Sequence, residues 1–379
     1  MKATLSRNVE RRAFLRSSLA AGALALASGG VESRVAAAFL AAEERRRFAP
    51  VKVARERLIR TVVGLRPYRA EGFVLRTERV GEKTVTHNYG HGGSGITLSW
   101  GVSEMAVEQA RATGHRSFAV LGCGVMGLTT ARLLQRRGLG ATIYARELPP
   151  ETTSNVAGGF WFPTSLHDPS KVDAAYVKQY KAACRVSQLA FQSLVGEQYG
   201  VRWMETFLLR REPPAVEHEL PGGAHLYPDT IVRRDPKRYF GFKHVTQFTT
   251  MLIEPAVYLN ALLRDYLIAG GRVVVRELRG PEELAALPEP AVINCTGLGS
   301  RALFGDERLV PVRGQLEVLL PQPEIDYCYL AGANYMFPRR DGIVLGGTFE
   351  HDRWTLEADP AQTATILEGN AEVMKGVRR

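Results

Sequence analysis

The sequence contains only four cysteines, Cys123, Cys184, Cys295 and Cys328. None lies in a CxxC pair, and none clusters with histidine at the spacing of zinc ligands. This pattern excludes a CxxC redox motif and a zinc finger, so no metal site is predicted and buried free thiols are expected.

Basic tracts interleaved with aromatic residues are also missing. The formal net charge is +10 over 379 residues, but part of the excess lies near the N-terminus, as in Arg11, Arg12 and Arg45–Arg47. Single-strand binding needs aromatic side chains beside the positive charge. We therefore expect no nucleic-acid partner.

No long apolar run marks a membrane anchor near the N-terminus. The run Leu19–Ala27 has nine residues, whereas a transmembrane helix needs about 20. It follows Glu10–Arg16, which resembles a twin-arginine motif, and Ala25–Ala27 or Ala36–Ala38 offers a small-residue cleavage site. We expect residues 1–27 to export the folded protein to the periplasm or the exterior. The alternative is the basic start of an ordinary amphipathic helix.

A glycine-rich loop follows the apolar strand predicted at Phe118–Leu121. Its spacing is GxGxxG, it opens a helix predicted at Leu128–Arg137, and a second strand is predicted at Ala141–Ala145. This order is typical of a dinucleotide-binding βαβ unit, in which the helix N-terminus stabilises the pyrophosphate. The cofactor-binding residues predicted here are Gly122, Gly124, Val125, Met126 and Gly127. The alternative is a glycine turn required only for packing.

The acid that normally binds the ribose is not clearly placed. The second strand ends in Tyr144-Ala145-Arg146-Glu147. Glu147 could be that acid, one residue late, or Arg146 could face a phosphate.

The stretch Thr152–Pro163, TTSNVAGGFWFP, resembles the D-amino acid oxidase family of FAD-dependent enzymes. So do Val292–Gly297, Val312–Gln315, Asn334–Pro338 and Leu345–Phe349. The resemblance covers most of residues 118–350. It implies an α/β fold in which a Rossmann-like FAD-binding domain of the GR2 type is interleaved with a mixed-sheet substrate domain. Further FAD contacts are implied at Thr152, Thr153, Ser154, Gly158, Gly159, Leu278, Thr296 and Gly297.

Two other motifs of that family stand before the glycine loop rather than near the C-terminus. They are Gly64–Arg69, with Leu65 where the family has an aromatic residue, and His87–Thr97. The chain therefore resembles a circularly permuted member. The resemblance assigns the substrate carboxylate to Arg66 and Tyr335 and the substrate amine to the Gly93 carbonyl. It also places Gly92, Gly95, Ile96 and Thr97 around the flavin.

One family position departs from the pattern. The family has a second pocket tyrosine where this chain has Ala331. Tyr329 would lie on the same face of an extended strand and could replace it. Arg339 and Arg340 could reach an acidic substrate, but before Asp341-Gly342 they are more typical of a hairpin turn.

The activity that the resemblance implies is oxidation of a D-amino acid, with hydride transfer from Cα to flavin N5. The products would be a 2-oxo acid, ammonia and, with O2 as acceptor, hydrogen peroxide. The alternatives are a dehydrogenase that reduces a quinone or carrier, and an inactive flavin-binding relic. The partners expected are the substrate and O2, and a homodimer stays open.

The domain organisation expected along the chain runs as follows: 1–27 signal, 28–60 helical lead-in, 61–115 permuted segment, 116–165 start of the FAD-binding domain, 166–270 substrate domain and helices, 271–305 return to the FAD-binding domain, 306–350 substrate sheet, and 351–379 C-terminal helix.

Overall fold

A computed structural model describes residues 48–213, 220–233 and 240–377. The predicted signal, residues 1–27, lies outside the described residues, as does most of the predicted helical lead-in. The prediction of helix is wrong for residues 48–60, the part of the lead-in that the structure describes. Only one 3-10 turn forms there, at Arg55–Arg57, and a strand begins at Leu58. None of the helices in the described part combines the length and apolar content that a bilayer crossing requires.

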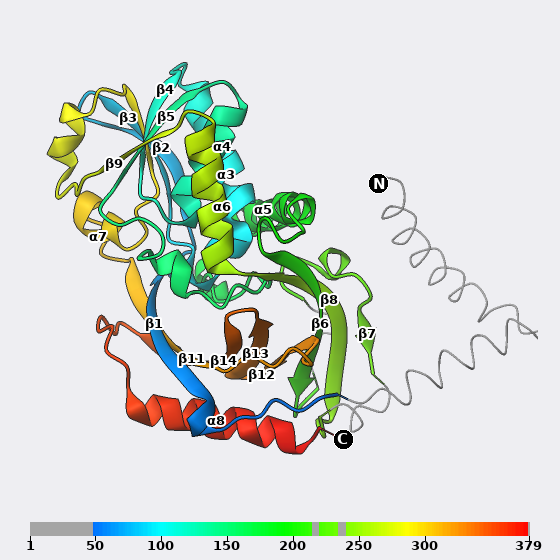
Figure 1. The fold of residues 1–379 in the computed structure, drawn as a ribbon. Coiled ribbons are helices and arrows are strands. Elements are labelled where there is room, and N and C mark those ends of the chain that lie inside the picture. Colours follow the sequence, from blue (N-terminus) through cyan, green and yellow to red (C-terminus); the bar gives the residue numbers. More distant parts are fainter. Residues whose placement is uncertain (1–47, 214–219, 234–239, 378–379) are drawn as a thin grey trace, which may run out of the picture. The chain divides into compact units, whose positions relative to one another are not determined.

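The predicted α/β fold is confirmed, with two sheets in the unit Pro50–Val377 (Figure 1). The smaller sheet has the order β2-β3-β10-β4-β5-β9. Its strands are β2 Val74–Val80, β3 Lys83–Tyr89, β10 Ala291–Asn294, β4 Ser117–Leu121, β5 Gly140–Ala145 and β9 Arg272–Val275. All neighbours are parallel except β2, which pairs antiparallel with β3. A parallel sheet of this kind is usually covered by helices on its faces.

The helices beside this sheet pack against one another through apolar side chains (Figure 1). They are α3 Gly95–Ala112, α4 Val125–Arg136, α5 Ala174–Ser193 and α6 Pro255–Ile268. At the centre, the buried Trp100 indole donates to the Tyr258 hydroxyl over 2.7 Å. Helix α3 lies in the segment that precedes the glycine loop, so this segment forms part of the main core.

The larger sheet is mixed and has the order β1-β11-β14-β13-β12-β6-β8-β7, with β15 paired to β11. Its strands are β1 Leu58–Tyr68, β11 Val310–Leu319, β14 Gly342–Gly346, β13 Asn334–Arg339, β12 Tyr327–Ala331, β6 Val201–Arg210, β8 His244–Ile253, β7 Ile231–Val232 and β15 Glu350–His351. The sequence pattern predicts strands at 315–320, 335–338 and 343–349, and these correspond to β11, β13 and β14. Strand β14 ends three residues earlier than predicted.

Helix α8, Pro360–Lys375, runs along the outer side of the larger sheet (Figure 1). The sequence predicts its start, with Asp359 as the N-cap and Pro360 at the first helical position. This start is confirmed, because the Asp359 side chain accepts a hydrogen bond from the Ala361 amide. Helix α7, Gly299–Phe304, is a short helix after β10.

The segment before the glycine loop joins both sheets. Strand β1 pairs antiparallel with β11 from Arg60↔Val318 to Tyr68↔Val310. Strand β3 pairs parallel with β10, which pairs on its other edge with β4 at the glycine loop. The order of the motifs predicts that residues 61–112 pack against the C-terminal half, and these strand pairings confirm it.

Candidate active site

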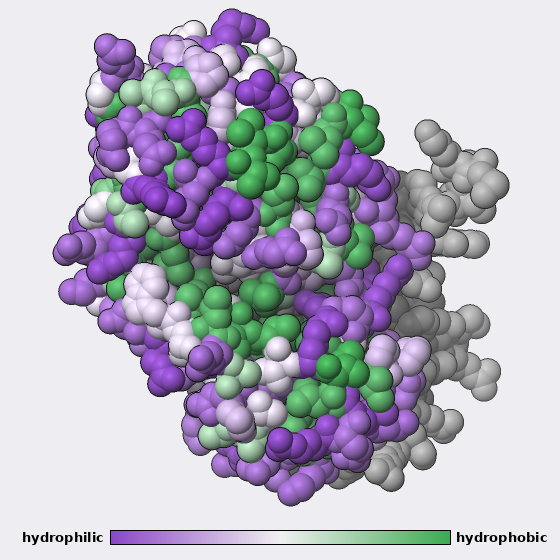
Figure 2. Space-filling view, turned by 60° about the vertical axis from the view of Figure 1, so that its left-hand side comes forward, coloured by the Kyte–Doolittle hydropathy of each residue, from purple (hydrophilic) through white to green (hydrophobic). Residues whose placement is uncertain are grey.

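One large cavity, of about 1600 Å³, lies between the two sheets and is lined by both. It exceeds the roughly 300–1000 Å³ of a site for a drug-sized ligand. Figure 2 shows apolar surface gathered across the middle of one face of the molecule, within a surface that is otherwise largely hydrophilic. Residues from distant parts of the chain line this one cavity, among them the glycine loop, Arg66 and Tyr335.

At one end of the cavity, the glycine loop connects β4 to α4. Gly122 has φ +101°, a value that side chains disfavour. A Cβ on Gly127 would lie 1.9 Å from the Gly122 carbonyl oxygen, so only glycine lets the helix approach the loop. Gly122, Gly124, Val125 and Met126 line the cavity, whereas Gly127 does not. Gly127 therefore packs the loop rather than facing a ligand.

The stretch Thr152–Ser154 lies against the start of α4. The Ser154 hydroxyl accepts a hydrogen bond from the Val125 amide over 3.0 Å. The Thr152 hydroxyl donates to the Asn155 side chain over 2.7 Å. These contacts hold the predicted cofactor-binding turn beside the positive end of the α4 dipole.

Arg146 and Glu147, whose roles the sequence left open, both line the cavity at this end. The Arg146 guanidinium donates to Glu147 over 2.8 Å and to Glu277 over 3.3 Å. Two carboxylates thus compensate the one arginine. A carboxylate is therefore available to accept a hydrogen bond from a ribose hydroxyl. Arg146 is not free to bind a phosphate, because its charge is already compensated.

In the middle of the cavity, His87–Thr97 brings β3 to the glycine loop. Asn88 donates to the Ser103 and Thr130 hydroxyls over 3.1 and 3.2 Å. The Gly93 amide donates to the Ser165 carbonyl oxygen over 2.9 Å, and Gly93 is exposed to the cavity. Of the residues predicted around the flavin, Gly92, Gly95, Ile96 and Thr97 line the cavity, as do Gly158, Gly159, Leu278, Thr296 and Gly297.

At the other end, Arg66 of β1 pairs with Val312 of β11, and its guanidinium reaches over Gly314. A Cβ on Gly314 would come within 2.4 Å of the Arg66 guanidinium nitrogens, so the glycine gives Arg66 its position. Arg66 donates to the Thr348 carbonyl oxygen over 3.2 Å and lies 5.5 Å from the centre of the Phe349 ring. Its remaining N–H groups can bind a carboxylate as a fork.

Tyr335 faces the same end of the cavity. Its ring occupies the space beside Gly346 and Gly347, where a Cβ would clash. Desolvation raises the pKa of Tyr335, and the nearby Arg66 only partly offsets this rise. The phenol therefore stays a neutral hydrogen-bond donor at physiological pH.

From Tyr335 an aromatic row continues along the cavity. The Phe337 ring lies 5.0 Å from Tyr335 and 4.6 Å from Phe160, stacked in both cases, and Phe162 follows at 5.9 Å. The sequence predicted a role for Tyr335 but none for Phe337, Phe160 or Phe162. A period-two pattern could have placed Tyr335 and Phe337 on one face, but only the fold brings Phe160 beside them.

Tyr329 does not replace the missing tyrosine. It is fully buried on the other face of the sheet, where its hydroxyl donates to the Asn370 side chain of α8 over 2.6 Å. Its neighbour Leu330 lines the cavity instead. Arg339 and Arg340 lie at the β13–β14 hairpin, outside the large cavity, and Arg339 pairs with Asp341 over 2.6 Å.

The four cysteines are free and buried, as expected. Within the described ranges, no group of three or more histidine, cysteine, aspartate or glutamate residues could hold a metal ion.

These features define a protein in which a largely parallel sheet with a glycine loop and a mixed sheet share one cavity. A model of the DAO family, described as FAD dependent oxidoreductase, matches residues 117–379. This chain belongs to that family and is an FAD-dependent oxidoreductase of the DAO type.

Several relatives are similar over about two thirds of the chain. The D-amino-acid oxidase of Rubrobacter xylanophilus is 34% identical over 254 residues, which are 65% of this chain and 74% of that protein. The D-aspartate oxidase of Homo sapiens is 30% identical over 259 residues, 66% of this chain and 73% of that protein. A crystal structure of glycine oxidase from Geobacillus kaustophilus has the same fold, with a TM-score of 0.50 at 17% identity, over 68% of this chain and 78% of that one.

The cavity fits FAD by its own geometry. A Cβ on Gly127 would clash with the Gly122 carbonyl oxygen, so only glycine lets the loop stay close to α4. Glu147 lines the cavity just after β5, where dinucleotide-binding folds carry the acid that binds the ribose. The residues that would hold the pyrophosphate are the amides at the start of α4. FAD would supply an acceptor for two electrons.

The buried His91 leads to a prediction about stability. Its ring stacks on Phe73 at 5.4 Å and is 2% exposed, and burial lowers its pKa from 6.5 to about 3. The unfolded chain therefore binds more protons between these pH values, so stability falls as the pH drops below 6.5. His91 should contribute about 2 kcal/mol to the loss between pH 7 and pH 5.

Denaturant unfolding of a His91→Gln variant at both pH values measures this contribution. The difference in unfolding free energy between pH 7 and pH 5 should shrink by about 2 kcal/mol relative to wild type. The same change at the exposed His225 is the control and should leave the difference unaltered. An unchanged difference in the His91 variant would refute the assignment.

Proposed function

We propose that this protein oxidises a D-amino acid to a 2-oxo acid and ammonia, and that O2 reoxidises the bound FAD to give hydrogen peroxide. The observation that carries the proposal is the pairing of Arg66 and Tyr335 at one end of the cavity that begins at the glycine loop. The balanced reaction consumes one water and one O2 per amino acid. Bound FAD would supply the acceptor for the hydride that leaves Cα, and water would hydrolyse the resulting imine to the 2-oxo acid and ammonia.

We assign roles to three of the chain's own residues on the family resemblance, which is supported by their position in the lining of one cavity. Arg66 and Tyr335 bind the substrate carboxylate, and the Gly93 carbonyl directs the amine. An amine that reacts in its neutral form needs no protein base, so positioning supplies the rate. The aromatic row beyond Tyr335 favours an apolar substrate side chain.

The relatives support this proposal, since two of the similar proteins are named D-amino-acid oxidase and D-aspartate oxidase. A dehydrogenase that passes electrons to a quinone or carrier would use the same site. An inactive flavin-binding relic is the third possibility, and the retained set of Arg66, Gly93 and Tyr335 argues against it.

The test is anaerobic mixing with matched D- and L-amino acids, beginning with phenylalanine, alanine and aspartate, followed by admission of air. We expect the D-enantiomers to bleach the flavin and air to yield equimolar peroxide. Bleaching with almost no peroxide would favour the dehydrogenase, and no bleaching with any amino acid would favour the relic.

An Arg66→Ala variant tests the carboxylate anchor in the same assay. Loss of a charge-assisted pair should lower kcat/KM by about 100-fold, which corresponds to ~3 kcal/mol. Arg60→Ala on the same strand is the matched control, because Arg60 is exposed and pairs only with Asp341 at the surface. Equal activity in the two variants would remove Arg66 from the mechanism.

We also propose that the chain is a circularly permuted member of its family. Three observations support this. The family match begins at residue 117, the unmatched β1 and β3 complete both sheets, and the Val51 amide lies 3.2 Å from the Met374 sulfur near the end of α8. A circular permutation preserves the contacts of the fold when the chain ends that are joined lie close together, as the segments around Val51 and Met374 do here.

A reordered chain tests the permutation. Residue 377 is joined to residue 50 by about six glycine and serine residues, which span roughly 13 Å. The chain is opened after Gly114, an exposed turn with no atom near its missing Cβ. We expect the product to bind FAD with the wild-type spectrum. A folded product, by circular dichroism, that binds no FAD would contradict the proposal.

Finally, we propose export by the twin-arginine route, on the motif at residues 10–16 and the apolar run after it. Replacing Arg11 and Arg12 by lysine should retain the protein in the cytoplasm, as measured by cell fractionation. Unchanged export of this variant would exclude that route.

A further inference from the structure

Strand β11 presents two different faces to its surroundings. Because side chains alternate along a strand, Gly314 and Leu316 face the large cavity, whereas Arg313, Gln315 and Glu317 face the other way. These three polar residues are fully buried. Buried polar groups of this kind are costly unless each is paired, so their partners show what they hold.

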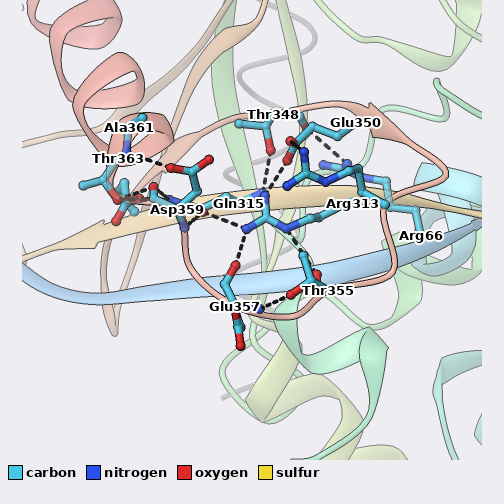
Figure 3. A network of polar contacts seen from close by, with 12 residues as sticks. Arg66, Arg313, Gln315, Thr348, Glu350, Thr355, Glu357, Asp359, Ala361 and Thr363 are labelled. Carbon is cyan, nitrogen blue, oxygen red and sulfur yellow. Dashed lines mark hydrogen bonds and ion pairs between the residues drawn. The ribbon is translucent and has the colours of Figure 1, made fainter.

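Arg313 is surrounded by the segment that follows β14 (Figure 3). Its guanidinium pairs with the Glu350 carboxylate and donates to the carbonyl oxygens of Thr355, at 3.2 Å, and Glu357. It also donates to the Gln315 side chain over 3.2 Å. Three of these four partners belong to residues 350–357, so one arginine organises that stretch of backbone.

Gln315 fixes the two ends of the same segment (Figure 3). Its backbone amide donates to the Thr348 hydroxyl over 2.9 Å. Its side-chain oxygen accepts from the Asp359 amide over 2.8 Å, and its side-chain nitrogen donates to the Asp359 carbonyl oxygen over 3.0 Å. We call residues 348–359 the wall segment.

The wall segment borders the substrate end of the cavity. Its Thr348 carbonyl oxygen accepts the hydrogen bond from Arg66, and its Phe349 ring lies beside that guanidinium. Phe349, Trp354 and Leu356 all line the cavity, and 47%, 50% and 63% of their surfaces are exposed. With so little apolar burial of its own, the segment depends on polar contacts for its position.

We propose that Arg313 is a positioning residue for the carboxylate anchor. It acts through the wall segment, since it fixes the backbone whose Thr348 carbonyl oxygen orients Arg66. This inference rests on the proposed role of Arg66 in binding a carboxylate. Arg313 itself does not line the cavity and touches no substrate.

The experiment measures binding without turnover. Benzoate and the uncharged benzamide are titrated into holoenzyme, and their Kd values are read from the change in the flavin spectrum. In an Arg313→Met variant the Kd for benzoate should rise by about 10-fold to 100-fold, because a small displacement of Arg66 weakens a directional fork. The Kd for benzamide and the Kd for FAD should change little.

Three further variants make the result specific. Arg202→Met is the matched control: Arg202 also pairs with a carboxylate, Glu254, and a carbonyl oxygen, but outside the cavity. It should leave both ligand Kd values unchanged. Glu350→Gln keeps the packing and removes one charge, so it should raise the benzoate Kd to a smaller extent. Arg313→Met should add little in an Arg66→Ala background, because the two residues act on one interaction.

The outcomes separate this inference from the proposed function. If wild-type holoenzyme binds benzoate no better than benzamide, the proposed role of Arg66 in binding a carboxylate is wrong, and the inference about Arg313 falls with it. If wild type prefers benzoate and both Arg313→Met and Glu350→Gln keep that preference, Arg66 stands and the inference is wrong. If Arg313→Met does not fold, Glu350→Gln alone decides between support and refutation.

Discussion

The antiparallel pairing of β1 with β11 is the interaction on which the site depends. It places the guanidinium of Arg66, which precedes the glycine loop in the sequence, over Gly314, which follows that loop by about 190 residues. Regular pairing from Arg60 to Tyr68 fixes the register, and a slip of one residue would turn Arg66 to the opposite face. The position of Arg66 is therefore fixed by the same pairing that holds the sheet together.

The other face of β11 extends the same constraint to α8. Gln315 and Glu317 share the Thr363 hydroxyl of that helix, at 3.0 and 2.8 Å. Glu317 also accepts from Thr61 of β1 over 2.5 Å. The strand thus holds a polar, fully paired layer on one side and the ligand cavity on the other. Such a layer specifies a single arrangement, because each unpaired member would cost free energy.

The parts of the fold that sequence predicted correctly are those with strong local signals. The glycine loop, α4, and the start of α8 at Asp359-Pro360 follow from short-range turn and cap chemistry. Strands β6 and β8 were not predicted. Strand β8 carries the polar residues Thr246, Gln247 and Thr250, all buried, and these interrupt the apolar pattern that marks a strand. The wrong helical lead-in before β1 shows the opposite error, since composition there favoured helix and pairing with β11 selected a strand.

The sequence by itself determined the family, the cofactor type and a set of site residues of which all but Gly127 line the cavity, because those residues lie in short contiguous motifs. Only the tertiary structure decided which of them meet. It turned Tyr329 towards Asn370 of α8 and Gly127 towards the loop backbone, and it added Phe160 and the wall segment to the site. The physical reason is that facing and proximity across a sheet depend on register and pairing between distant segments, which local patterns do not encode.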